Sequence, residues 1–250
     1  MARRIDDKAC LRLIRKGLKA GILEPDGRVN HPEEGSPQGG SVSPILANIY
    51  LHHALDLWVE ETVKAHCQGA VYLCRYADDF VCAFERQADA ERFYRVLGKR
   101  LETFSLEVAA EKTNLIRFSP HEWKASGAFE FLGFEVRWGM GRWRKPVLKR
   151  RTARKKYRAA LINFQAWCRQ HCRLPKETLF AKLNAKLRGY YQYYGLRGNF
   201  DRLDDFDDQM KRILFRMLNR RSQRRSYNWL GFAELLKVFR LERPRICHDF

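Results

Sequence analysis

Two apolar runs that flank a pair of aspartates constrain the fold of this chain more than any other feature. Val71-Tyr-Leu-Cys-Arg-Tyr76 and Phe80-Val-Cys-Ala-Phe84 are rich in strand-forming residues and are separated by Ala77-Asp78-Asp79. This spacing predicts a hairpin with both carboxylates at or beside its turn. Carboxylates held side by side repel, so a shared proton, a basic neighbour or a divalent cation is the usual remedy. Hard oxygen ligands suit Mg²⁺, with Mn²⁺ as an alternative, although adjacent aspartates also commonly cap backbone amides at turns.

Helical and strand patterns surround the hairpin. Apolar spacing predicts a short helix near residues 10–18, a long helix that begins at Ser43-Pro44, and an amphipathic helix near residues 93–104. Strands are expected near residues 114–118 and, from the aromatic residues, over residues 129–138. Gly139-Met-Gly141 then turns the chain back.

Charge and secondary-structure pattern both change near residues 141–151. Residues 1–140 hold 19 Lys/Arg against 20 Asp/Glu, whereas residues 141–250 hold 29 against 9, a net charge of +20. Past residue 151 the pattern is helical, at about 152–172, 175–194, 203–221 and 228–240. We therefore expect an α+β fold, with an antiparallel sheet and helices over residues 1–140 and a basic helical domain over residues 141–250.

The basic surplus favours a polyanion as the partner of the second domain, because tryptophans and tyrosines are interleaved with the cations. Nucleic acid is the first candidate, and ribosome-like packing or an acidic protein partner are the alternatives. The run 142–158 holds ten Lys/Arg and no acid in 17 residues, which indicates phosphate contact there. The RNA-binding residues expected in this run are Arg150, Arg151, Arg154 and Lys155.

The sequence shows neither a membrane-spanning segment nor a signal peptide, which bears on the cellular compartment of the protein. It contains no apolar run long enough to cross a membrane, and its first residues lack the apolar core of a signal peptide. The seven cysteines are odd in number and form no CxxC pair. We expect a cytoplasmic protein with reduced structural thiols and no membrane partner.

The hairpin and the segment before it carry a family resemblance. Tyr76-Ala-Asp-Asp79 resembles the catalytic motif of reverse transcriptases, and residues 35–48 (GSPQGGSVSPILAN) are similar to the loop and helix that line the incoming nucleotide and the templating base in that superfamily. Glycines there would let the backbone approach a sugar and base closely. The resemblance assigns catalysis and metal binding to Asp78 and Asp79, and nucleotide or template binding to Pro37, Gln38, Gly39, Gly40 and Tyr76.

Two further segments agree with this resemblance. Glu111-Lys112-Thr113 resembles the family segment that places a lysine near the triphosphate, which gives Lys112 a catalytic role in balancing charge. Phe131-Leu-Gly-Phe134 resembles the primer-grip hairpin, which assigns Leu132 and Gly133 to contact with the primer strand. A solvated lysine and an ordinary core strand are the alternative interpretations of these two segments.

The C-terminal part narrows the family. Residues 183–195 (LNAKLRGYYQYYG) are similar to the signature helix of the group II intron maturase domain, and Ser226–Leu230 with Pro244–Ile246 resembles the end of that domain. On this helix the cations Lys182, Lys186 and Arg188 are expected to contact RNA phosphates. The tyrosines are expected in the core, with stacking on RNA bases as the alternative. The resemblance thus implies a reverse-transcriptase palm followed by a thumb/maturase domain.

The implied activity is RNA-directed DNA polymerisation, with an RNA template or intron, a DNA primer and deoxynucleoside triphosphates. The family metal site uses three carboxylates, and no segment here resembles the upstream strand that carries the third. We therefore expect a truncated form that is inactive alone unless a separate chain supplies the fingers and the third carboxylate. The alternatives are a non-catalytic RNA-binding maturase or splicing cofactor, and a nonfunctional remnant of a mobile element.

Overall fold

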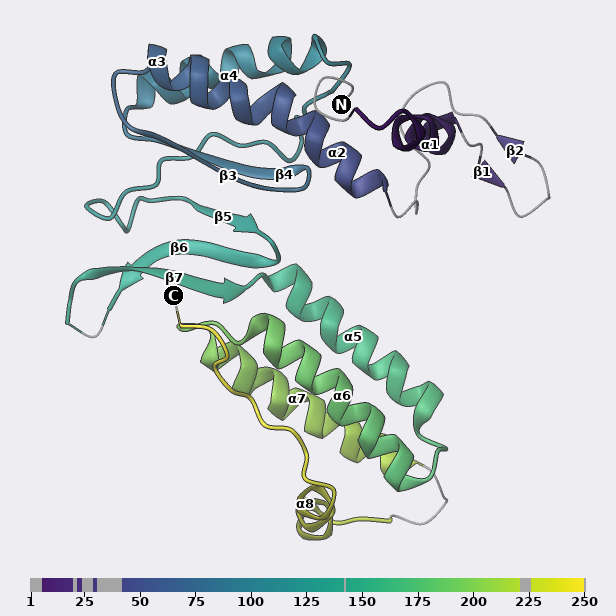
Figure 1. Ribbon diagram of the computed structural model, residues 1–250. Coiled ribbons are helices and arrows are strands. Elements are labelled where there is room, and N and C mark those ends of the chain that lie inside the picture. Colours follow the sequence, from purple (N-terminus) through teal and green to yellow (C-terminus); the bar gives the residue numbers. More distant parts are fainter. Residues whose placement is uncertain are drawn as a thin grey trace. The chain divides into compact units, whose positions relative to one another are not determined.

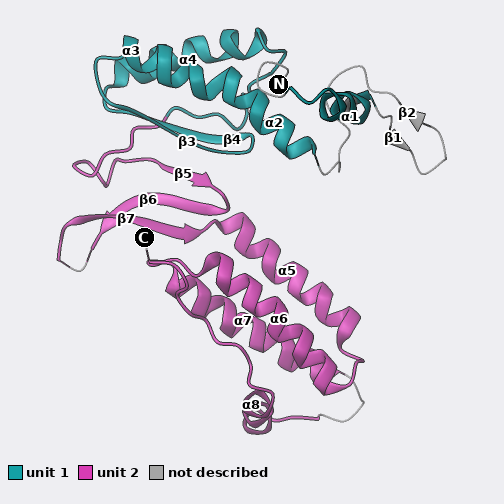
Figure 2. Ribbon diagram, in the orientation of Figure 1, with its two compact units in different colours: residues 1–115 teal, residues 116–250 magenta. Residues whose placement is uncertain are grey.

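The computed structural model describes residues 6–19, 22–23, 29–30, 42–141, 143–220 and 226–249. The predicted nucleotide- or template-binding residues Pro37, Gln38, Gly39 and Gly40 lie outside the described residues. Contacts along the chain group it into two compact units, residues 1–115 and residues 116–250 (Figure 2). Each unit is described by itself below.

Unit 1 is built from helices that cover a hairpin. Helix α1 (Lys8–Lys19) is followed by the short strands β1 (Ile22–Leu23) and β2 (Val29–Asn30). The predicted long helix is confirmed as one helical run, composed of α2 (Ser43–Leu51), the π-helical segments η1 (His52–Asp56) and η2 (Val59–Val63), and α3 (Lys64–His66), with proline in its first turn. Strands β3 (Val71–Tyr76) and β4 (Asp79–Phe84) form the predicted hairpin, and α4 (Gln87–Glu102) follows.

The core of unit 1 lies between these helices and one face of the hairpin. Helices α2 to α4 lie on the same side of β3 and β4 (Figure 1). Alternation along β3 buries Val71 and half-buries Leu73, whereas Tyr72 and Tyr76 stay exposed on the other face. The buried members of the cluster are Leu55, Val59, Val63, Val71, Phe93, Leu97 and Leu101.

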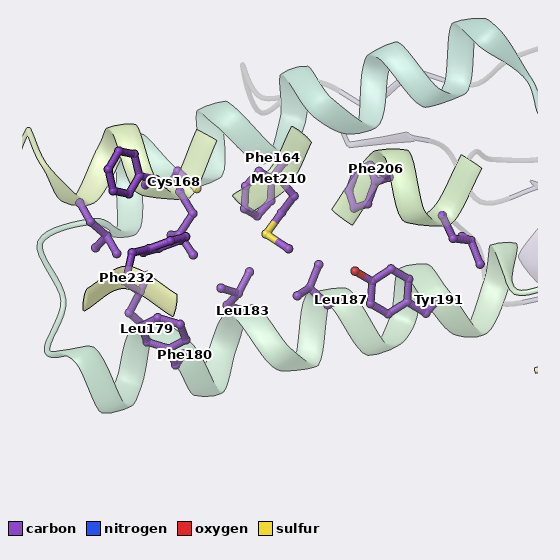
Figure 3. Close-up of a cluster of buried hydrophobic side chains, with 14 of the residues drawn as sticks. Phe164, Cys168, Leu179, Phe180, Leu183, Leu187, Tyr191, Phe206, Met210 and Phe232 are labelled. Atoms are coloured by element: carbon purple, nitrogen blue, oxygen red, sulfur yellow. The ribbon is translucent and has the colours of Figure 1, made fainter. Parts of the chain in front are cut away.

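Unit 2 starts with a three-stranded antiparallel sheet in the order β5 (Ala128–Phe131), β6 (Phe134–Met140), β7 (Pro146–Thr152). Helices α5 (Arg154–His171), α6 (Lys176–Tyr194), α7 (Phe200–Leu218) and α8 (Trp229–Val238) follow and confirm the predicted helical region. Their apolar faces meet in one large cluster, in which Phe164 of α5, Leu183 of α6, Met210 of α7 and Phe232 of α8 come together (Figure 3). None of the described helices is long and apolar enough to span a membrane.

Two strand predictions were wrong. Residues 114–118 form no strand, although the Arg117 carbonyl accepts a hydrogen bond from the Gly127 N–H at 2.9 Å. The aromatic strand predicted over residues 129–138 is two strands, because Leu132 and Gly133 adopt φ of +50° and +78° and form a two-residue turn between them. This turn agrees with the hairpin that the family resemblance implied.

The predicted domain boundary and the grouping of contacts fall at different places. The change in charge at 140/141 lies inside the β6–β7 hairpin, whose strands pair from Phe134 with Thr152 to Met140 with Pro146. The contacts instead divide the chain between Leu115 and Ile116. Backbone pairing therefore attaches the first part of the basic run to the aromatic strands that precede it.

Candidate functional site

The two predicted catalytic aspartates lie at the turn of the β3–β4 hairpin. The strands pair from Val71 with Phe84 to Tyr76 with Asp79, so Ala77 and Asp78 form a two-residue turn and Asp79 begins β4. Tyr76, Asp78 and Asp79 are all exposed. Both carboxylates are therefore open to a ligand from solvent.

The backbone of this turn is strained. Ala77 adopts φ of +53°, in the left-handed region that glycine normally occupies in hairpin turns. An L-residue with a Cβ pays about 1–2 kcal/mol for this conformation. Such strain persists only where the surroundings hold the backbone in place, and here that role falls to Arg75.

Arg75 joins the turn to the long helical run. Its Nε and one terminal nitrogen each donate to a carboxylate oxygen of Asp56 at 2.7 Å, a bidentate pair. The other terminal nitrogen donates at 2.8 Å to the Ala77 carbonyl and at 2.8 Å to the Asn48 side-chain oxygen. The Arg75 guanidinium thus links the carbonyl of the strained hairpin turn to Asn48 of α2 and to Asp56 of η1.

Charge in this network favours the ionised pair. The hydrogen bond from Arg75 lowers the pKa of Asp56, and the same bond raises the pKa of Arg75. The Asp56 carboxylate also lies 3.3 Å from Nδ1 of His52. The side chain of Arg75 is only 13% exposed, so the pair is shielded from water more than a surface ion pair.

The two carboxylates at the turn are the type of ligand that Mg²⁺ prefers, but they are fewer than the three that the family metal site uses. Asp78 and Asp79 supply hard carboxylate oxygens, which Mg²⁺ prefers. Within the part of the chain that the structure describes, no group of three or more His, Cys, Asp or Glu side chains is arranged to hold a metal. Two carboxylates alone would hold Mg²⁺ weakly.

Lys112, to which the family resemblance gives a catalytic role, lies in a turn after α4. It is exposed there, and its N–H donates to the Ala109 carbonyl at 2.9 Å. Among the described residues, no hydrogen bond or ion pair joins its side chain to Asp78 or Asp79. Its catalytic role therefore stays a prediction.

The Leu132-Gly133 turn of unit 2 is held by the end of α6. The Tyr193 hydroxyl donates to the Leu132 carbonyl at 2.9 Å, and the Ala153 N–H donates to the Gly133 carbonyl at 2.9 Å. A Cβ at Gly133 would lie 3.2 Å from the Tyr194 hydroxyl oxygen. Both carbonyls of the turn are thus engaged inside the unit. Sequence reasoning missed Tyr193 as a support of this turn.

The seven predicted RNA-binding cations of unit 2 lie on β7, α5 and α6. Arg154 and Lys155 in the first turn of α5, and Lys182 and Lys186 one turn apart on α6, are exposed. Arg150 and Arg151 are consecutive in β7, so their side chains point to opposite faces of the sheet.

Arg188 is already engaged within the unit. Its Nε and a terminal nitrogen lie 3.1 Å and 3.0 Å from a carboxylate oxygen of Glu242. Nearby, Asn184 accepts from the Glu242 N–H at 3.0 Å, and its amide donates to the Phe239 carbonyl at 3.2 Å. These contacts indicate that Asn184 and Arg188 fasten the segment after α8, a role the sequence reasoning did not assign.

Comparison with known families gives two matches. Residues 4–136 match the family model described as reverse transcriptase (RNA-dependent DNA polymerase), and residues 163–231 match the group II intron, maturase-specific domain. The first match covers more than half of the 250 residues and contains the Asp78-Asp79 turn. The second covers the second half of α5, all of α6 and α7, and the start of α8.

Individual relatives match shorter segments. Group II intron-encoded protein LtrA of Lactococcus lactis subsp. cremoris is 50% identical over 56 residues, which is 22% of this chain and 9% of the relative. Protein YkfC of Escherichia coli (strain K12) is 32% identical over 161 residues, 54% of this chain and 40% of the relative. An uncharacterized 91 kDa protein in a cob intron of Schizosaccharomyces pombe is 48% identical over 60 residues, 24% of this chain and 7% of the relative. The chain thus matches less than half the length of each of these relatives.

The aspartate turn lies inside the polymerase match, and most of the buried cluster of unit 2 lies inside the maturase match. On this evidence the chain belongs to the reverse transcriptase family, among the group II intron reverse transcriptases and maturases.

Proposed function

We propose that this chain is an RNA-directed DNA polymerase of the group II intron type, with a palm followed by an RNA-binding thumb/maturase region. The observation that carries the proposal is the pair of exposed carboxylates, Asp78 and Asp79, at a strained turn that Arg75 supports from within the protein. Its substrates are an RNA template, a DNA primer and deoxynucleoside triphosphates.

In this proposal each predicted site residue has a distinct task. Asp78 and Asp79 hold Mg²⁺ or Mn²⁺, which when bound activates the primer 3′-hydroxyl and stabilises the leaving pyrophosphate. The segment Pro37–Gly40 and Tyr76 line the nucleotide and template, and Lys112 balances charge on the triphosphate. The Leu132-Gly133 turn, with its two carbonyls engaged, contacts the primer strand.

The metal site of this proposal needs a third carboxylate from a polypeptide segment outside residues 1–250, in the same chain or in a separate one. Two observations support this part. The described residues offer only Asp78 and Asp79 as acidic ligands at the hairpin turn, and no run in the sequence resembles the family strand that carries the third acid.

Primer extension tests the catalytic part. The chain is assayed on an RNA template with Mg²⁺ or Mn²⁺, alone and with a polypeptide that carries the fingers and first palm strand of a family member. We expect DNA synthesis only in the mixture, with loss of synthesis in Asp78→Asn and normal synthesis in Glu102→Gln, which removes another exposed carboxylate of unit 1. Synthesis that survives Asp78→Asn would refute catalysis at this turn, and robust synthesis by residues 1–250 alone would refute the need for a carboxylate from outside them.

The second candidate function is a non-catalytic RNA-binding maturase or splicing cofactor. The observation that favours it is the net charge of +20 over residues 141–250, with Lys182 and Lys186 exposed on α6. It predicts tight, steeply salt-dependent binding to structured RNA that Asp78→Asn leaves unchanged. Replacing both lysines by alanine should flatten the plot of log affinity against log salt by about one unit for each phosphate that the variant no longer binds. Lys237→Ala is the matched control, because Lys237 already pairs with Glu234 on α8. Tight RNA binding without synthesis in any mixture would favour this candidate.

A further inference from the structure

Helices α5 and α7 pack against each other in unit 2 (Figure 1). In the first turn of α5 the Tyr157 hydroxyl donates to the Asp205 carboxylate at 2.8 Å. Further along, Gln165 of α5 lies beside Met217 of α7, so the two helices run in the same direction. Their C-terminal halves therefore lie next to each other.

A small cavity of about 50 Å³ opens between these C-terminal halves. It is lined by Gln165 of α5, by Ile213, Arg216 and Met217 of α7, and by Arg220 in the turn that follows α7. The two apolar lining residues are half-buried, whereas the glutamine and both arginines are exposed. The cavity thus has an apolar floor and a rim of N–H donors.

The two helices bring no acid to this rim. Helix α5 contains no acidic residue, and Asp208, the last acid of α7, lies about two helical turns before Arg216. Nε of Arg216 donates to the Arg212 carbonyl at 3.3 Å, which helps to orient its guanidinium. Within the part of the chain that the structure describes, no ion pair joins Arg216 or Arg220 to a carboxylate. The positive charge at the cavity is therefore not neutralised by these helices.

An arginine in the last turn of a helix also compensates the helix dipole, and Arg216 is placed to do so. That role does not require a second guanidinium and an amide around the same cavity. Forked arginine donors match the oxygens of phosphate and carboxylate groups. The cavity has room for a few waters, which suits one phosphate group better than a nucleobase. A carboxylate would meet the same donors, but the net charge of +20 over residues 141–250 favours a polyanion with many phosphates.

We propose that the cavity between α5 and α7 binds a backbone phosphate of RNA, held by Arg216 and Arg220 with the Gln165 amide as a third donor. This inference rests on the RNA-binding part of the proposed function and does not depend on polymerase activity. It adds a contact on α7, where the sequence predicted none.

Binding of the full chain to a stem-loop RNA over a range of salt concentrations tests the proposal. Arg216→Gln/Arg220→Gln should weaken binding by about 10- to 100-fold and lower the slope of log affinity against log salt by about one unit. Arg216→Lys/Arg220→Lys should restore the slope but not the full affinity, because lysine cannot make the forked contact. Gln165→Leu should weaken binding by about 2- to 10-fold with an unchanged slope.

The matched control is Arg197→Gln/Lys237→Gln. It removes two cations of unit 2 that already pair with Asp249 and Glu234, so RNA binding should change little. Thermal unfolding of each variant checks the fold. An equal loss of affinity in this control and in Arg216→Gln/Arg220→Gln would overturn the proposed site, because the loss would then reflect net charge alone.

Labelling with an arginine-selective dicarbonyl reagent, mapped by mass spectrometry, locates the contact in the wild-type chain. Bound RNA should protect Arg216 and Arg220 and leave Arg197 reactive. Inorganic phosphate at equal ionic strength is the second arm of this experiment. Protection by inorganic phosphate without protection by RNA would assign the cavity to a free phosphate and overturn the RNA contact.

Two negative results separate this inference from the function on which it rests. If the wild-type chain does not bind RNA, the RNA-binding part of the proposed function fails together with the phosphate site. Tight wild-type binding that Arg216→Gln/Arg220→Gln leaves intact, with both arginines still reactive in the complex, overturns the phosphate site alone.

Discussion

The Arg75–Asp56 pair should contribute more to stability than any exposed ion pair of unit 1. Its two partners are 13% and 24% exposed and are joined by two hydrogen bonds of 2.7 Å. Breaking a fully buried pair from one side costs about 3–5 kcal/mol, whereas exposed pairs contribute about 0–1 kcal/mol. For this partly buried pair we expect Arg75→Gln to cost about 2–3 kcal/mol, because the change also removes the bonds to Asn48 and to the Ala77 carbonyl.

Hydrogen exchange resolved by mass spectrometry is the appropriate assay, because it measures the opening of one segment and does not require that the two units unfold together. A loss of about 2 kcal/mol should speed exchange of the amides in residues 71–84 by about 30-fold. A double-mutant cycle with Asp56→Asn should then give a coupling energy of about 1.5–2 kcal/mol.

The control cycle uses Glu60 and Lys64, an i,i+4 pair on the same helical run whose side chains are 56% and 36% exposed. Its coupling energy should be no more than about 0.5 kcal/mol. If the Arg75–Asp56 cycle gives no larger value than this one, the guanidinium is not what holds the turn, and the argument from the strained Ala77 backbone fails with it.

Three further results follow from the contacts. Because Arg75 lowers the pKa of Asp56 in the folded state, the pair stabilises the unit fully at pH values above 3.8, the ordinary pKa of the group. This contribution is lost as the pH falls through the lower pKa of the folded state. Acid should therefore speed hydrogen exchange over residues 71–84 more in the wild type than in Asp56→Asn. A Cβ at Gly195 would clash with the Tyr191 and Arg245 carbonyl oxygens, so Gly195→Ala should cost about 1–3 kcal/mol and expose residues 243–249 to protease. A Cβ at Gly189 would have open space around it, so Gly189→Ala should be neutral or slightly stabilising. Burial raises the pKa of the Cys82 thiol to about 12, so a thiol reagent at pH 8 should modify the exposed Cys74 in the native protein and Cys82 only after unfolding.

Elements with a local signature were predictable from the sequence. The β3–β4 hairpin and helices α4 to α8 follow from alternation, helical spacing and breaker residues, which act over a few positions. The break inside residues 129–138 was missed as a strand boundary because leucine rarely adopts the positive φ that Leu132 has here. The pairing of Phe131 with Phe134 and the hydrogen bonds from Tyr193 and Ala153 to the turn carbonyls support that conformation.

The sequence predicted the carboxylates of the candidate site but not the residues that hold the site in place. Asp78 and Asp79 stand out because their motif is contiguous. Arg75 reaches Asn48 and Asp56 across 27 and 19 positions, and Arg188 reaches Glu242 across 54. Such contacts depend on how helices and strands pack, so no spacing rule along the chain reveals them. For the same reason the sequence could not separate an Arg188 that binds RNA from one that fastens its own chain.

The segment that closes over the end of α6 has a consequence for synthesis of the protein. Leu196 forms a parallel bridge with His248, whose ring also bonds the Gln192 carbonyl at 2.9 Å across 56 positions. At about 5–20 residues per second, translation needs about 3–11 s to deliver those positions. During that interval the Gln192 and Gly195 carbonyls at the end of α6 lack the partners that residues 247 and 248 supply. Folding of this end of the unit therefore waits on the ribosome, and slow codons in the last stretch would lengthen the period in which a chaperone or the RNA itself can reach it.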